Sequence, residues 1–98
     1  MATKLTEAQI DAELMQRSGW RRVDADSAHA IFREFKQKNF LDGLAFVVKV
    51  AVLAEKANHH PDVLLTYPCV AITLTTHDAG GITDRDFKLA AQIDDLGK

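Results

Sequence analysis

The sequence has little of several features that would mark a particular class of protein. It has a single cysteine, Cys69, so no intrachain disulfide can form, which fits a reducing compartment. Its 12 basic and 14 acidic residues give a formal net charge of −2, which offers no basic surface for direct binding of nucleic acid. The longest apolar stretch, residues 44–54, is interrupted by Lys49 and is too short to span a membrane.

The sequence also shows no targeting signal and no linker between domains. Residues 1–13 lack the apolar core of a secretory signal peptide, and together with the lone cysteine this predicts a cytoplasmic protein. There is no internal repeat, low-complexity tract or linker. The chain has 98 residues, 47% of them hydrophobic, so we expect a single domain over residues 1–98 with one core. A functional site should then be a surface groove or a subunit boundary, because so small a domain cannot enclose a large cavity.

Local patterns predict seven secondary-structure elements. A capping box of Thr6 and Gln9 opens a helix over 7–17. The other expected elements are a hairpin of strands 20–23 and 28–35 around the turn 24–27, a helix over 40–57 capped by Asn39, strands 63–67 and 70–75, and a helix capped by Thr83. The pattern of 28–35 also fits a helix, with Ile31 and Phe35 four positions apart. The order α-β-β-α-β-β-α favours an α+β fold with an antiparallel sheet.

The helix expected over 40–57 is apolar on more than one side. Leu41, Leu44 and Val48 follow one another at steps of three and four, and Phe46 and Val50 lie off that stripe. A helix that is apolar on more than one side is buried on more than one side. We therefore expect this helix, about 27 Å long, to contact a second subunit.

Three of the four histidines fall at the ends of these elements. His59 and His60 follow the long helix, and His77 follows the strand 70–75. Histidine is the side chain whose ordinary pKa, about 6.5, allows it to give or take a proton near neutral pH. If strands 63–67 and 70–75 pair as a hairpin, the three histidines meet at one rim of the sheet, which suggests a proton-transfer site.

Other interpretations of these residues stay open at this point. A histidine at the end of a helix often only caps backbone carbonyls. A metal site is a second alternative, in which Glu55 and Asp86 would complete the ligands, although adjacent histidines seldom bind one ion. The same carboxylates could instead hold the histidine rings in one orientation.

Each residue near the histidines can be interpreted either as purely structural or as part of a binding site. Tyr67 either packs in the core or a turn, or forms an aromatic wall for a flat ligand. Thr75 and Thr76 are typical strand residues, but their hydroxyls could also bind a polar heterocycle beside the third histidine. His29 stands apart on a strand and is interpreted as incidental to the site.

At these positions the sequence resembles the pterin-4a-carbinolamine dehydratase family. Its signature is an acidic residue, His-His-Pro after three positions, an aromatic residue, a histidine after nine more positions, and an aspartate. It is met here by Glu55, His59-His60-Pro61, Tyr67, His77 and Asp86. Residues 76–86 look like the family's turn and helix start, and shorter matches extend the resemblance over nearly the whole chain. Animal members carry a tryptophan where this chain has Val63, so any ligand contact from that ring is absent here.

The resemblance implies an α+β fold in which a four-stranded antiparallel sheet carries three helices on one face, with residues 28–35 as a strand. It also implies a homodimer or homotetramer and no metal or organic cofactor. The implied substrate is 4a-hydroxytetrahydrobiopterin, which aromatic amino acid hydroxylases leave behind. Its dehydration gives quinonoid dihydrobiopterin, a step of tetrahydrobiopterin recycling.

The resemblance also implies roles for individual residues. The catalytic set carried over is His59, His60, His77 and Asp86, with His59 and His77 expected to transfer protons. The residues expected to contact the pterin are Asn58, His59, His60, Thr75, Thr76, His77 and Asp78, with Glu55 and Tyr67 in support. Animal members also serve as dimerisation partners of a transcription factor, and some relatives are thought to assist assembly of other proteins. The alternative function is therefore a non-catalytic module that binds a protein partner.

Overall fold

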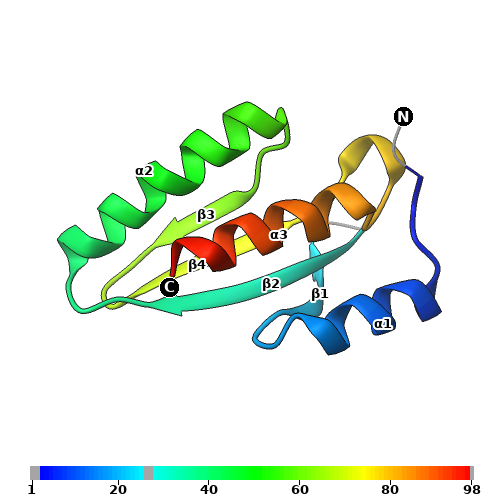
Figure 1. Cartoon of the computed structure of the whole chain (residues 1–98), viewed down its shortest axis with the longest axis horizontal. Helices are drawn as coiled ribbons and strands as arrows, with labels where there is room; N and C mark the ends of the chain where they lie inside the picture. Colours follow the sequence, from blue (N-terminus) through cyan, green and yellow to red (C-terminus); the bar gives the residue numbers. More distant parts are fainter. Residues whose placement is uncertain (1–2, 26–27, 98) are drawn as a thin grey trace.

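The computed structural model describes residues 3–25 and 28–97. Within them, the helices and strands follow one another in the order predicted from the sequence (Figure 1). They are α1 (Glu7–Gln16), β1 (Arg21–Ala25), β2 (Ala28–Lys36), α2 (Phe40–Ala57), β3 (Asp62–Leu65), β4 (Cys69–Leu74) and α3 (Asp84–Leu96). A short 3₁₀ turn that the sequence did not predict, η1 (His77–Ala79), follows β4.

The four strands form one antiparallel sheet in the order β1-β2-β4-β3. β1 and β2 pair as the predicted hairpin, although residues 26 and 27 of its turn lie outside the described part of the chain. β2 pairs with β4, with Ile31 opposite Leu74, so the strand interpretation of this segment is confirmed. β3 and β4 form the second hairpin, with Asp62 opposite Thr73. The start of β3 and the end of β4 therefore lie at the same end of the sheet.

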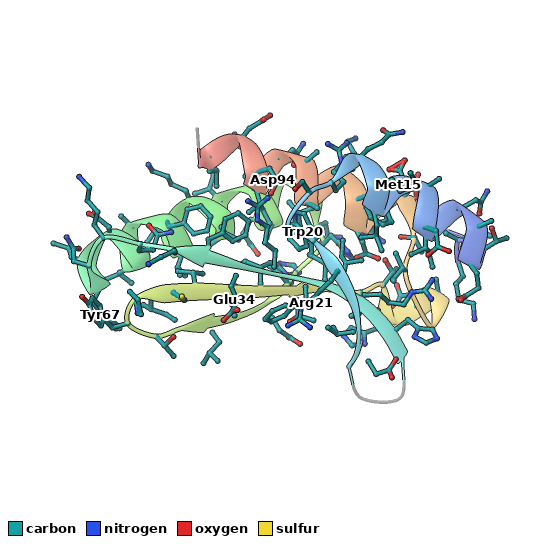
Figure 2. The ribbon with its side chains drawn as sticks, turned by 90° about the horizontal axis from the view of Figure 1, so that it is seen from below. Met15, Trp20, Arg21, Glu34, Tyr67 and Asp94 are labelled. Carbon is teal, nitrogen blue, oxygen red and sulfur yellow. The ribbon has the colours of Figure 1, made fainter. Side chains whose placement is uncertain are left out.

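All three helices cover one face of the sheet, as Figure 2 shows edge-on. β4 alternates buried and partly buried residues, and Val70, Ile72 and Leu74 are completely buried. Such alternation is typical of an antiparallel strand with one face against the core. Phe87 and Ile93 bring α3 into the same core. The predicted α+β architecture is therefore confirmed.

α2 is apolar on two sides, and the sheet buries only one of them. Gly43, Phe46, Val50 and Ala54 are the buried positions. A Cβ atom at Gly43 would lie 2.8 Å from Leu65 Cδ1, so a larger residue here would have to displace the end of the Leu65 side chain. The opposite side carries four apolar residues that are 45% to 72% exposed, which we call the outer stripe: Leu41, Leu44, Val48 and Val52.

The helices begin at the predicted caps. Thr6, Asn39 and Thr83 each accept a backbone N–H of the first turn through the side chain. At the far end of α3, Asp94 accepts hydrogen bonds from Trp20 Nε1 and Arg33 Nη1 (Figure 2). Both ends of α3 are thus anchored to other elements. None of the helices in the described segments is both long enough and apolar enough to cross a membrane.

Candidate active site

The turn that ends α2 leaves one of two adjacent histidines buried and the other exposed. Asn58 caps α2 in the left-handed conformation (φ 50°, ψ 44°), and its N–H points to the carbonyls of Ala54 and Glu55. The N–H of His59 also donates to the Ala54 carbonyl, at 3.1 Å. Because the chain reverses here, His59 is only 7% exposed, whereas His60 is exposed.

The buried His59 ring is held by a buried carboxylate of α3. Asp86 is 0% exposed, and its Oδ1 lies 2.5 Å from His59 Nε2. The carboxylate is an acceptor, so Nε2 carries the hydrogen of this bond. The neutral ring then keeps its lone pair on Nδ1, for which we find no hydrogen-bond partner among the described residues. Asp86 therefore fixes both the orientation and the tautomer of His59.

The second oxygen of Asp86 ties the site to the end of β4. Oδ2 accepts the Thr83 N–H at 2.9 Å and the Thr76 hydroxyl at 2.9 Å. The hydroxyls of Thr76 and Thr83 are themselves 2.7 Å apart. Because Thr76 gives its hydrogen to Asp86, the Thr83 hydroxyl is the donor to Thr76. One buried carboxylate thus joins the end of α2, the end of β4 and the start of α3.

His77 stands next to this network on the surface. It is exposed and opens η1 directly after Thr76. The Thr76 carbonyl accepts the N–H groups of Ala79, Gly80 and Gly81 at 3.1 to 3.3 Å, which ties the turn to the end of β4. The predicted hairpin geometry is present, so the backbone of His77 is held beside the buried pair of His59 and Asp86.

His60 has a carboxylate partner of its own. Its Nε2 lies 2.5 Å from Glu55 Oε2, with both side chains exposed. Glu55 lies in the last turn of α2 and orients the ring from there. The sequence interpretation in which carboxylates hold histidine rings therefore matches the observed contacts. No group of three or more His, Cys, Asp or Glu side chains in the described segments is arranged to hold a metal ion.

Several other residues of the predicted site do not have the positions or contacts expected of residues that bind the ligand directly. Tyr67 is exposed at the turn between β3 and β4, at the opposite end of the hairpin from the histidines (Figure 2). Within one copy of the chain it cannot be an aromatic wall of this site, because β3 runs away from the histidines. The Thr75 hydroxyl donates to the His29 carbonyl at 2.8 Å and joins β4 to β2. Asn58 and Asp78 are exposed close to the histidines in sequence.

A cavity of about 420 Å³ opens beside His59 between two helices. We call it the α2–α3 groove, and its lining residues are Leu53, Lys56, Ala57, His59, Arg85, Lys88, Leu89 and Gln92. Arg85 Nη2 donates to the Asn58 carbonyl at 2.8 Å. The sequence interpretation did not single out Arg85 or Lys88. Their spacing of three on a predicted helix, which puts them on one face, is the signal that could have found them.

Comparison with known protein families gives one clear match. The sequence profile described as "Pterin 4 alpha carbinolamine dehydratase" matches residues 3–96. A protein of Picosynechococcus sp., provisionally named pterin-4-alpha-carbinolamine dehydratase, is 48% identical over 96 residues, which cover 98% of this chain and 100% of that protein. A protein of Roseiflexus sp. with the same provisional name is 46% identical over 98% of this chain and 99% of its own.

Solved structures agree with this match. The crystal structure of a transcriptional coactivator/pterin dehydratase from Brucella melitensis superposes with a TM-score of 0.89 at 35% identity, covering 98% of this chain and 100% of that chain. A pterin dehydratase-like protein described as a RuBisCO assembly factor in the alpha-carboxysome superposes with a TM-score of 0.66 at 25% identity. This second match covers 81% of the present chain and 89% of the other.

Proposed function

Because the chain belongs to the pterin-4a-carbinolamine dehydratase family and is therefore a hydro-lyase, we propose that it dehydrates 4a-hydroxytetrahydrobiopterin to quinonoid dihydrobiopterin, in tetrahydrobiopterin recycling. In this reaction the N5–H bond breaks, and its electron pair forms the double bond between C4a and N5. The C4a–O bond breaks at the same time, and the departing oxygen takes up a proton to leave as water. No electrons pass to another compound. The reaction therefore requires only one base, for the N5 proton, and one acid, for the departing oxygen.

The observation that carries the proposal is the buried pair of His59 and Asp86. With Asp86 holding the hydrogen on Nε2, the Nδ1 lone pair of His59 is available to accept a proton. We assign proton transfer to His59 and His77, and binding and positioning of the substrate to His60. Each positioned acid or base contributes about 10² to 10⁴ in rate.

The other site residues take supporting roles in this proposal. Glu55 orients His60 through their direct contact. Asn58 and Asp78 are exposed near the histidines and would contact the polar edge of the pterin. The hydroxyls of Thr75 and Thr76 are already bonded within the protein, so we propose that these residues shape the site rather than bind through their side chains.

A stopped-flow absorbance assay with freshly generated 4a-hydroxytetrahydropterin tests the reaction directly. We expect the protein at micromolar concentration to accelerate dehydration by at least about 10² over buffer, as for one working acid–base group. A crystal soaked with a dihydropterin should show the ring beside His59, His60 and His77. A dehydration rate equal to that in buffer alone would refute the proposed activity.

We further propose that the chain forms a homodimer or homotetramer through the outer stripe of α2. The four residues of the stripe are all apolar. A second copy can therefore pack against it without burying an unpaired charge. The proposed location is the cytoplasm, which the lone Cys69 supports.

A protein partner is the second candidate function. The structural neighbour described as a RuBisCO assembly factor and the exposed outer stripe both favour it. A scaffold alone has no use for histidines with ordered carboxylate partners. A variant with alanine at His59, His60 and His77 should keep a stoichiometric partner if this function holds. Loss of the partner in that variant, with the fold intact, would contradict it.

A further inference from the structure

The charge of the α2–α3 groove differs from that of the chain as a whole. Three of its eight lining residues are cationic, namely Lys56, Arg85 and Lys88, and none is acidic. The complete chain has a small excess of acidic over basic residues. Two other cavities contain carboxylates, four in one and two in the other, and Lys88 also lines the second of these. The groove therefore favours a negatively charged occupant.

The three cations are also available to a ligand. None of them forms a salt bridge within residues 3–25 and 28–97. Arg85, which lines the groove, donates one hydrogen bond to the neutral carbonyl of Asn58, and this contact holds its guanidinium at the end of α2 without cancelling its charge. Of the two carboxylates adjacent to Arg85 in the sequence, Asp86 is completely buried and already accepts from His59, Thr76 and Thr83. The other, Asp84, is exposed and does not line the groove. Glu55, next to Lys56, contacts His60 instead.

The position of the groove relates it to the proposed reaction. His59 lines the groove and is one of the two residues assigned to proton transfer. In a pterin, C6 is bonded directly to N5, the atom that loses its proton. The first atom of a C6 substituent is therefore only two bonds from N5, and the substituent can extend along His59 into the groove.

We propose that the α2–α3 groove is a subsite for an anionic group, a carboxylate or a phosphate, carried by the C6 substituent of the pterin. This inference rests on the proposed function, because it places the pterin ring beside His59. The site should then bind tetrahydropterins with an acidic C6 side chain more tightly than tetrahydrobiopterin, whose C6 side chain is neutral. Leu53 and Leu89 provide apolar contact for the first atoms of the substituent, and the three cations bind its charged end.

Equilibrium binding of stable 7,8-dihydropterins tests the subsite without relying on turnover. The matched ligands are 6-hydroxymethyl-7,8-dihydropterin and its phosphate ester, with 7,8-dihydrofolate as the carboxylate. At low ionic strength the phosphate ester should bind about tenfold or more tightly than the alcohol, because two or three cations act on one charge. High salt should reduce this ratio, since the charges are near the surface. The comparison with dihydrofolate shows which anion the groove prefers.

Two variants separate the groove from general charge effects. The double substitution Lys56→Gln and Lys88→Gln should reduce the affinity ratio of ester to alcohol to below about threefold, as the Coulomb attraction is removed. The control is Lys49→Gln, which removes one charge from α2 outside the groove and should keep the wild-type ratio. Retention of the ratio in the double variant would overturn the subsite.

The outcomes for the two proposals can be told apart. If the alcohol and the ester bind equally well and the dehydration assay is positive, the subsite is wrong and the proposed function stands. If no dihydropterin binds and no dehydration occurs, both are overturned. Inorganic phosphate should compete with the ester but not with the alcohol. Competition with both would also argue against a separate anion subsite.

Discussion

Oδ1 of Asp86 lies 2.5 Å from Nε2 of His59, although 27 positions separate the two residues in the chain. Both are buried, and Asp86 also accepts from Thr76 and Thr83. The N3 residue of the α3 capping box is thus at the same time the residue that orients the proposed base. The same carboxylate therefore caps the start of α3 and holds the site together.

Replacement of Asp86 by asparagine tests this double role. In Asp86→Asn the amide can present the wrong group to His59 Nε2, so we expect kcat to fall by at least about 10². The buried donors of Thr76 and Thr83 lose a charged acceptor, which should cost about 1 to 3 kcal/mol of unfolding free energy. Stopped-flow kinetics and urea unfolding measure the two effects. The control is Asp84→Asn in the same helical turn, which is exposed and should change neither.

His77→Ala tests the exposed partner in proton transfer. We expect dehydration to slow by at least about 10². Stability should change by under about 0.5 kcal/mol, as for an exposed side chain, because the turn is held by backbone bonds to Thr76. The matched control is His29→Ala, another exposed histidine, on β2, which should keep wild-type activity. A loss of less than threefold in folded His77→Ala protein would rule out the assigned role.

Glu55→Gln addresses the second pair of histidine and carboxylate. The side chains of His60 and Glu55 are 59% and 75% exposed, so the pair should contribute under about 0.5 kcal/mol to stability. Loss of ring orientation should instead raise KM by about threefold to tenfold, with kcat less affected. The reason is that the lost contact stabilises the bound substrate and the transition state equally. Glu34→Gln, an exposed glutamate on β2, is the control for loss of one charge. A fall in kcat with unchanged KM would place His60 in proton transfer instead.

Val48→Asp tests the outer stripe as a subunit contact. A charge in the middle of an apolar interface has no partner, so we expect the assembly to dissociate to monomers at micromolar concentration. Analytical ultracentrifugation and circular dichroism report mass and fold. The control is Met15→Asp, which places the same charge on an exposed residue of α1 (Figure 2) and should leave the mass unchanged. A wild-type protein that is already monomeric would contradict the proposed assembly.

Much of the fold could be predicted because its signals are local. Asn39 caps the N-terminus of α2 and Asn58, in the left-handed conformation, caps its C-terminus, and the bounds of α2 match the predicted helix. Thr83 and Asp86 form the capping box of α3. The turn at 24–27 favoured a strand over 28–35, and the family resemblance settled this choice, since Ile31 and Phe35 alone fit a helix as well.

The orientation of α2 could not be predicted from its pattern. Both the stripe at Leu41, Leu44 and Val48 and the side at Phe46 and Val50 are apolar, and the sheet buries the second. The sequence offers no reason to prefer one side, because the choice depends on how Gly43, Phe46 and Val50 fit against the sheet. Likewise, Tyr67 follows the histidine pair closely in the sequence, yet a strand carries it to the other end of the hairpin.

The residue types and their spacing alone determined the order of elements, the helix caps and the presence of three histidines at element ends, because these depend on neighbours a few positions away. Only the tertiary structure decided which histidine is buried and which carboxylate each one contacts. It also gathered Lys56, Arg85 and Lys88 into one groove. These outcomes depend on the packing of α2 and α3 against the same sheet, which brings together side chains that no local rule connects.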